Sequence, residues 1–121
     1  MTTLIDSSAW MDCLRGKTAG GGEVISLLEA GHATLCPPVW VELWRGAKGK
    51  REEAALLRLR DLCGMLAIDD ETWEIMGRLS RASLRSGLNC PFADILIVAC
   101  ARRHQVRLLH TDKHMDALQK L

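Results

Sequence analysis

The sequence predicts an α/β fold in three layers, with a central parallel sheet of four or five strands covered by helices on both faces. Short apolar runs of strand length recur along the chain, and a longer stretch with helical periodicity separates each from the next. Parallel neighbours need such crossovers, whereas antiparallel neighbours can be joined by hairpins. With 121 residues the chain is long enough for one core and too short for two, so 1–121 is predicted to be a single domain.

The first crossover is predicted to connect two strands through two helices. Four segments have the length and composition of buried strands, namely 2–5, 33–36, 65–68 and 106–110. Between the first two lie helical patterns over 9–15 and 23–30, with three flexible glycines at 20–22 separating them. Gly31 follows the second pattern as a helix C-cap would.

The second and third crossovers are also helical. The second opens with prolines at 37–38, which favour a helix start, and it predicts helices near 39–46 and over about 50–63. The third begins with acidic residues in the first turn of a helix over 69–85, and it breaks at Gly87. The helical pattern restarts behind Asn89 and Pro91, and a final short helix is expected after Asp112.

Composition places the chain among ordinary globular proteins. Hydrophobic residues make up 48% and charged residues 26%, and there are 3 prolines, which excludes a disordered or collagen-like chain. The longest apolar run, 95–101, is far shorter than the roughly 20 residues of a membrane span, and no signal peptide is visible. Because the net charge is only +1, any nucleic-acid site must be local.

The cysteines predict buried, reduced thiols rather than disulfides or a zinc site. Their number is odd, they are widely spaced, and no two form a CxxC pair. This pattern is typical of a cytoplasmic protein. The five are Cys13, Cys36, Cys63, Cys90 and Cys100.

Acidic residues gather where the predicted strands end, which is the edge at which open parallel sheets bind ligands. Asp6 ends the first strand, and Asp112 follows the last one. Glu42 lies one turn into the helix after the second strand, and Asp94 precedes the apolar run 95–101. All four have apolar neighbours, so their charges lose hydration that something must replace.

A divalent cation is the partner that these acids favour. No Lys or Arg lies within three residues of Asp6 or Asp94, although the other two acids have Arg45 and Lys113 nearby. Mg²⁺ or Mn²⁺ is the usual ion at sites built from carboxylates and water. Each acid taken alone is explained equally well as a helix cap or a solvated edge residue, but the four together favour the cation site.

Asp6, Glu42, Asp94 and Thr111-Asp112, in this order along an α/β chain, resemble the four acidic positions of PIN-domain nucleases. Size and element order look most like the VapC family, the ribonuclease toxins of bacterial and archaeal toxin–antitoxin pairs. The resemblance covers nearly the whole chain and implies a PIN-like fold in which the ends of the first and last strands meet. The chain departs from the family's pattern in two places, Ser7, where threonine is common, and Met115, where an aromatic residue is usual.

The resemblance implies a Mg²⁺-dependent endoribonuclease, with Mn²⁺ as a substitute ion, that hydrolyses RNA phosphodiester bonds in the prokaryotic cytoplasm. It assigns metal binding and catalysis to Asp6, Asp94 and Asp112, with Glu42 as a ligand or a base that positions water. It also implies a cognate VapB-like antitoxin, a homodimer, a toxin–antitoxin hetero-oligomer and no membrane association. The number of ions, one or two, and the identity of the RNA are open at this point.

Other residues are candidates for auxiliary roles, each with a plain structural alternative. Ser7 and Thr111 could bond a carboxylate or a phosphate, or simply form turns, and Asp116 could join the site or lie exposed. A basic run that could bind the RNA backbone consists of Arg45, Lys48, Lys50 and Arg51.

Three further groups favour structural roles. Trp40 and Trp44 are one helical turn apart, and core or dimer packing is favoured over stacking on a base. His110 and His114 bracket the last acid, but one ends a strand and the other enters a helix, which argues against zinc. A helical face that either extends the basic path or is merely solvated carries Arg78, Arg81 and Arg85.

Two other functions are alternatives. A catalytically inactive PIN-like binding module would keep the fold and the antitoxin surface, but the presence of all four acids argues against it. A Mg²⁺-binding, receiver-like signalling domain would use Asp69 after the third strand, but the chain lacks the acidic pair expected with Asp6.

Overall fold

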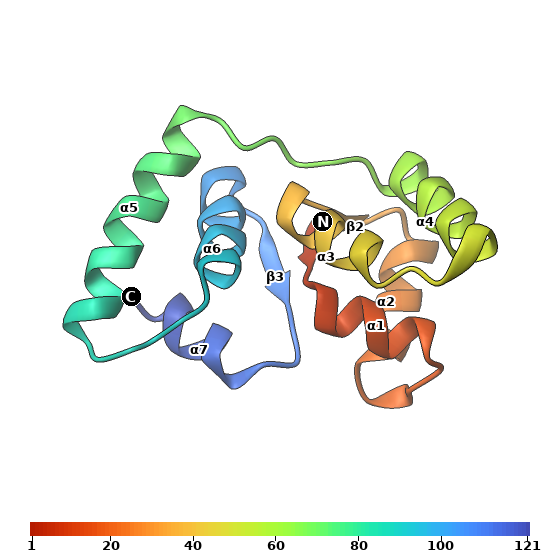
Figure 1. The fold of residues 1–121 in the computed structure, drawn as a ribbon, viewed down its shortest axis with the longest axis horizontal. Coiled ribbons are helices and arrows are strands. Elements are labelled where there is room, and N and C mark those ends of the chain that lie inside the picture. The colour runs from red at the N-terminus through yellow and green to blue at the C-terminus, as the bar shows by residue number, and fades with distance from the viewer.

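A computed structural model describes the main chain of residues 1–121 and all side chains except those of residues 18–21. Three short strands alternate with helical crossovers, as the sequence predicts (Figure 1). The elements in chain order are β1 (Thr3–Ile5), α1 (Ser7–Leu14), α2 (Thr18–Glu29), β2 (Ala33–Thr34), α3 (Pro37–Arg45), α4 (Gly49–Cys63), α5 (Asp70–Arg85), α6 (Phe92–His104), β3 (Arg107–Leu109) and α7 (Lys113–Gln119).

The sheet has the strand order β2-β1-β3, and both pairings are parallel. Leu4 of β1 lies opposite Thr34 on one side and Leu108 on the other. β1 is fully buried at this central position. Because all three strands run the same way, their carboxyl ends reach the same edge of the sheet, which confirms the predicted fold class.

The segment predicted as a further strand, 65–68, contributes one parallel bridge, Met65 with Leu35, rather than a strand. The chain leaves the sheet after this bridge, because the Ala67 carbonyl is bound by the ring of His104 and Asp69 already caps the next helix. Within the described main chain the sheet therefore has three strands and this bridge, and not four or five strands.

Helices cover the sheet on two sides, as Figure 1 shows. The group α5, α6 and α7 lies to the left of β3 in that view, and α1 and α2 lie to the right, below α3 and α4. The helix α6 is buried around its whole circumference over 95–101, so it is the central helix of its layer. None of the described helices is both long and apolar enough to cross a bilayer.

Most of the predicted helix boundaries are confirmed. Asp69 caps α5 through a capping box with Thr72, and Gly31 and Gly87 adopt the positive φ values of 74° and 73° that end a helix. The helix α2 begins at Thr18, earlier than predicted. The break predicted at 20–22 is wrong, because the main chain of α2 is helical through these positions.

The cysteines are free thiols, as predicted. The prediction that all five are buried is wrong: Cys36 and Cys100 are buried in the core, while the other three are only partly covered.

Candidate active site

Asp6 lies at the centre of the candidate site. It follows β1 directly and caps α1, and its Oδ1 accepts bonds from the Ala9 N–H at 3.0 Å and the Ser8 hydroxyl at 2.7 Å. Its own N–H donates to the Leu109 carbonyl at 3.0 Å, which ties it to the end of β3. The residue is 3% exposed, and this burial raises the pKa of its carboxyl.

Asp112 reaches the same edge from the other strand. Ile5 pairs with Leu109 in parallel register, so the residues after β1 and after β3 leave the sheet side by side. Asp112 caps α7, with Oδ1 accepting from the His114 N–H at 2.9 Å. Its charge adds to the effect of burial in raising the pKa of Asp6, which places the two carboxylates within electrostatic reach.

Glu42 approaches from α3, the helix that starts directly after the end of β2. Its Oε1 is buried and has no hydrogen-bond partner among the described residues. Burial raises the pKa of Glu42 most, followed by the charges of Asp94 and Asp6, while Ser7 and Arg45 oppose the shift. A buried carboxylate oxygen without a partner is costly, so this atom is available to a ligand.

Asp94 comes from the first turn of α6. This helix leads into β3 and packs against it, so its first turn returns to the edge where β3 ends. Burial is the largest cause that raises the pKa of Asp94, followed by the charges of Asp112 and Asp6. His114 acts in the opposite direction.

The structure therefore brings together the four acids that the sequence singled out. Their charges raise one another's pKa: Asp112 acts on Asp6 and Asp94, Asp6 acts on Asp94 and Glu42, and Asp94 acts on Glu42. Such a group of acids is stabilised by a positive ion or by protonation. No group of three or more metal-ligating side chains among the described residues already has the arrangement of a metal centre. The donor set still fits a hard divalent cation, because it offers carboxylate oxygens only and leaves Glu42 Oε1 without a partner.

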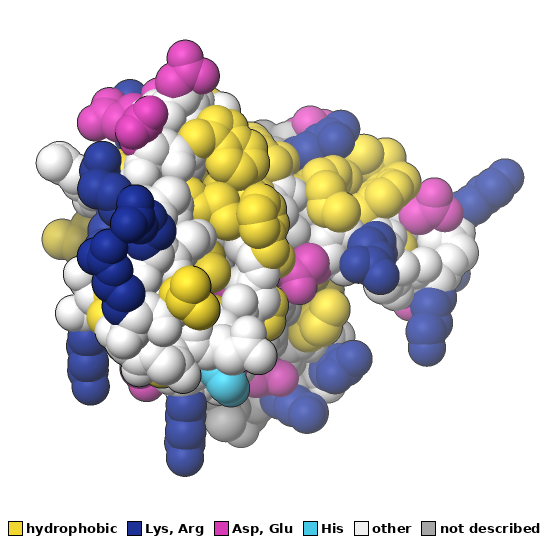
Figure 2. Space-filling model, turned by 60° about the vertical axis from the view of Figure 1, so that its left-hand side comes forward, with side chains coloured by type: hydrophobic (Ala, Val, Ile, Leu, Met, Phe, Trp, Pro, Cys, Tyr) yellow, Lys and Arg dark blue, Asp and Glu magenta, His cyan; other side chains and the backbone are white. Residues whose placement is uncertain are grey.

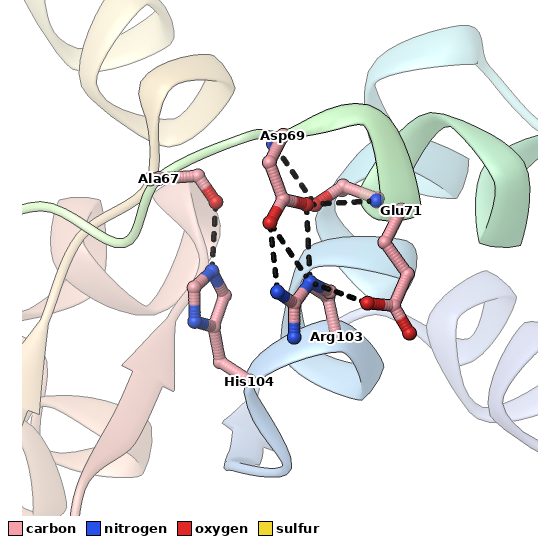
Figure 3. Close-up of polar contacts among 6 residues, drawn as sticks. Ala67, Asp69, Glu71, Arg103 and His104 are labelled. Carbon is pink, nitrogen blue, oxygen red and sulfur yellow. Dashed lines mark hydrogen bonds and ion pairs between the residues drawn. The ribbon is translucent and has the colours of Figure 1, made fainter.

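Arg103 forms an ion pair with Asp69 and not with the four acids. Arg103, near the end of α6, donates Nε to both carboxylate oxygens of Asp69 at 3.0 Å and Nη2 to Oδ2 at 2.8 Å, with Glu71 at 3.4 Å (Figure 3). These bonds hold the pKa of Asp69 well below its usual range. Asp94 and Arg103 are nine residues apart on α6, or about 14 Å along the helix axis. Asp69 is therefore part of a structural ion pair, which does not support the receiver-like alternative.

The auxiliary candidates lie around the acids in different ways. Ser7 is next to Glu42 and lowers its pKa, and the Thr111 N–H donates to the Ser8 hydroxyl at 3.4 Å. Asp116 bonds the His110 ring at 3.1 Å and is largely exposed. Ser8, which bonds both Asp6 and the turn after β3, was not among the residues predicted from the sequence. Its position two residues after the first acid is the only signal that the sequence carried.

The basic run is exposed at the end of α3 and the start of α4. Arg45 is close enough to lower the pKa of Glu42, and the Glu52 carboxylate bonds the Lys48 N–H at 2.8 Å. A second basic row, Arg78, Arg81 and Arg85, lies on α5, which is on the opposite side of the molecule from α4 in Figure 1. Figure 2 shows a group of Lys and Arg side chains with a hydrophobic patch beside it. The two basic groups therefore do not form one continuous basic surface.

The tryptophan pair has a packing role. Trp40 and Trp44 stack with ring centroids 5.4 Å apart, and Arg60 of α4 lies over the Trp40 ring at 4.7 Å. Because a residue two positions along a helix points about 200° away, Glu42 lies on the other side of α3 from both rings. This arrangement favours contact between α3 and α4 over stacking on a base beside the acids.

Comparison with known proteins agrees with this fold. A model of the PIN domain family matches residues 3–121. The chain is 32% identical over 123 residues to a VapC ribonuclease of Mycobacterium bovis and to the ribonuclease VapC11 of Mycobacterium tuberculosis, with 98% of this chain and 92% of each relative covered.

Solved structures share the fold along the whole chain. The structure of VapBC2 from Rickettsia felis, bound to a DNA fragment from the promoter, matches with a TM-score of 0.81 at 16% identity, over 100% of this chain and 96% of that one. The structure of VapBC-1 from Haemophilus influenzae matches with a TM-score of 0.83 at 13% identity, over 99% and 93%.

Proposed function

This chain belongs to the PIN domain family, among the VapC ribonucleases, and from that premise we propose that it is a Mg²⁺-dependent endoribonuclease toxin, held inactive by a cognate antitoxin. The observation that carries the proposal is the meeting of four acids at one edge of a parallel sheet, with one buried carboxylate oxygen left unbonded. The proposed location is the cytoplasm, and the free thiols support it, because thiols stay reduced there.

Asp6, Asp94 and Asp112 are the proposed holders of the cation, directly or through water. A bound Mg²⁺ ion stabilises negative charge that develops on the phosphoryl oxygens and makes a nearby water more acidic. Glu42 Oε1, unbonded and on an acid whose pKa is raised, is suited either to hold the ion or to accept the proton of the attacking water. Asp6 is fixed by two donors, so it serves as the rigid point of the site.

The exposed basic run beside Glu42 is the proposed contact for the RNA backbone. Arg45 is the member nearest the acids, and Lys48 and Arg51 continue from it onto the start of α4. Contacts of this kind supply affinity rather than sequence choice, and they make binding depend on salt.

An apolar groove is the proposed seat for a segment of the antitoxin. Its volume is about 440 Å³, and it lies between α1, α3 and α4, lined by Met11, Leu14, Leu43, Leu56 and Leu59 among others. The matched structures are VapBC toxin–antitoxin complexes, and an apolar side chain of the partner would fill this groove. Leu14 is 61% exposed at the rim, so Leu14→Asp should leave the fold intact and weaken capture of a co-expressed antitoxin.

The exposed face of α5 is the proposed surface for a homodimer. Its residues follow the 4-3-4 spacing of a helix seam, Trp73, Gly77, Ser80 and Leu84. Trp73 and Leu84 are 47% and 80% exposed. When the α5 helices of two copies pair antiparallel, Trp73 of each copy contacts Leu84 of the other copy. Acids occupy the first half of the helix and arginines the second, so the same pairing also matches opposite charges.

Sedimentation tests this surface. Leu84→Glu should convert the dimer to a monomer, while Leu62→Glu, at a residue of α4 that is 74% exposed, should not. An unchanged dimer in the Leu84→Glu protein would assign the interface to another face.

The test of function is cleavage of purified RNA by the chain freed of antitoxin. We expect no cleavage in EDTA and full cleavage when Mg²⁺ is restored. Cleavage that persists in EDTA would refute the cation site. A protein that binds antitoxin but cuts no RNA in Mg²⁺ would be the inactive binding module instead.

A further inference from the structure

We propose that His110 is a positioning residue of this site: its ring holds the turn between β3 and α7 so that Asp112 faces the other acids. The inference rests on the proposed function, because Asp112 is one of the proposed cation ligands. In the sequence, His110 stands out only as a poor zinc ligand. In the structure both of its ring nitrogens are bonded to protein atoms, one of them to the backbone of Asp112.

Each ring nitrogen of His110 has a different partner. The Asp112 N–H donates to Nδ1 at 3.2 Å. Nε2 lies 3.1 Å from Gln119 Oε1 and 3.1 Å from Asp116 Oδ1, both on α7. A nitrogen that accepts a bond from an amide carries no proton, so the ring proton is on Nε2, where it donates to α7. The ring therefore joins the start of the turn to the helix that follows it.

The position of Asp112 depends on this turn more than on packing. The turn spans only 110–112, between the last residue of β3 and the first of α7. The side chain of Asp112 bonds the His114 N–H, which belongs to the same local structure and does not fix the turn to the sheet. Among the described residues, two contacts connect the turn to other elements: the bond from the Thr111 N–H to Ser8 Oγ, which is long at 3.4 Å, and the ring of His110, which contacts α7.

The contacts of the His110 ring hold the turn more firmly than the bond from Thr111 to Ser8 does. Its side chain is 11% exposed and its bond to the Asp112 N–H is part-buried, whereas the bond from Thr111 to Ser8 is exposed. α7 itself is anchored to the core by Met115 and Leu118, which are 1% and 0% exposed. Through His110, the backbone of Asp112 is thus held against a rigid helix. Residues of this kind, bonded to a ligand rather than to the ion, typically change metal affinity by 10- to 100-fold when they are replaced.

Two amide substitutions separate the two ring nitrogens. Asparagine at 110 keeps an acceptor near the place of Nδ1 and has nothing at Nε2, whereas glutamine reaches the place of Nε2 and leaves the Asp112 N–H without its acceptor. His110→Ala removes both contacts. His32→Asn, at a partly exposed histidine at the other edge of the sheet, is the matched control.

The experiment measures two quantities for each variant: the Mg²⁺ concentration that gives half-maximal RNA cleavage, and the rise in melting temperature caused by Mg²⁺ alone. We expect His110→Gln and His110→Ala to need about tenfold more Mg²⁺ on both readouts, within the range for such residues. The Mg²⁺ requirement of His110→Asn and of the control should stay within about threefold of the wild type. This should hold even if the His110→Asn protein melts at a lower temperature in EDTA.

Two results would overturn the inference. One is a wild-type Mg²⁺ requirement in the His110→Gln protein. The other is an equal change in the asparagine and glutamine variants, which would mean that His110 only stabilises the fold. If the alanine variant fails to fold, the two amide variants still decide between these outcomes. A wild-type protein that shows neither response to Mg²⁺ would refute the proposed function itself, and the role of His110 with it.

Discussion

Replacing Asp94 by asparagine removes one of the four carboxylate charges and keeps the shape of the side chain. The surrounding helix should not change, because residues 95–101 of α6 are buried independently of this side chain. The charges of Asp6 and Asp112 both raise the pKa of Asp94, so the variant relieves repulsion in the protein without metal. In EDTA we therefore expect the Asp94→Asn protein to melt at the same temperature as the wild type or higher.

The effect reverses when Mg²⁺ is present. A ligand at 100 times its dissociation constant stabilises the folded state by about 2.7 kcal/mol, or roughly 10 °C at about 4 °C per kcal/mol for a chain of this size. Losing one carboxylate of the site should weaken Mg²⁺ binding at least about tenfold. At the same Mg²⁺ concentration the ion then stabilises the folded state by only about 1.4 kcal/mol, or roughly 5 °C in melting temperature. RNA cleavage at this Mg²⁺ concentration should fall by about 100-fold or more, because the variant also loses part of the charge arrangement used in the reaction.

The assay pairs thermal unfolding with RNA cleavage across a Mg²⁺ titration. The control is Asp61→Asn, which removes one negative charge from an exposed position on α4 outside the site. The control should match the wild type in both measurements. If Asp94→Asn cuts RNA at the wild-type rate with the same Mg²⁺ dependence, Asp94 does not belong to the site.

Three other results are expected. Lys48→Ala combined with Arg51→Ala should flatten the dependence of log RNA affinity on log salt by about 1.4, since each phosphate contact on a single strand contributes about 0.7; an unchanged slope would mark this run as merely solvated. In EDTA, the melting temperature should rise as pH falls from about 7.5 to about 5, because the raised pKa values of Asp6 and Glu42 mean that their protonated forms favour the fold, and a fall over this range would contradict the shifts. Dithiothreitol should change the melting temperature by less than about 1 °C, because all five cysteines are free, and a large drop would reveal a disulfide.

The sequence predicted those parts of the site that local patterns encode. Asp6 follows an apolar strand and Asp94 precedes an apolar helix, so the order of residues alone is enough to place both at the ligand-binding edge. The capping of α5 by Asp69 follows in the same way from a polar first turn.

Tertiary contacts account for what the sequence did not predict. The bond from the Thr111 N–H to Ser8 joins residues 103 positions apart, and no local pattern predicts it. The ring of His110 bonds α7 only because that helix folds back on the end of β3. The segment 65–68 has the apolar composition of a strand, but bonds to α6 and the cap of α5 end its pairing at Met65.

The central claim is that the four acids form one cation site that cleaves RNA. The most direct test is the cleavage rate of the wild-type chain, freed of antitoxin and treated with EDTA, as a function of added Mg²⁺. We predict no cleavage without the ion and a saturable rise with it, and Asp6→Asn should abolish this rise in a protein that stays folded. Cleavage without added ion, or a Mg²⁺-dependent rate that Asp6→Asn leaves unchanged, would contradict the claim.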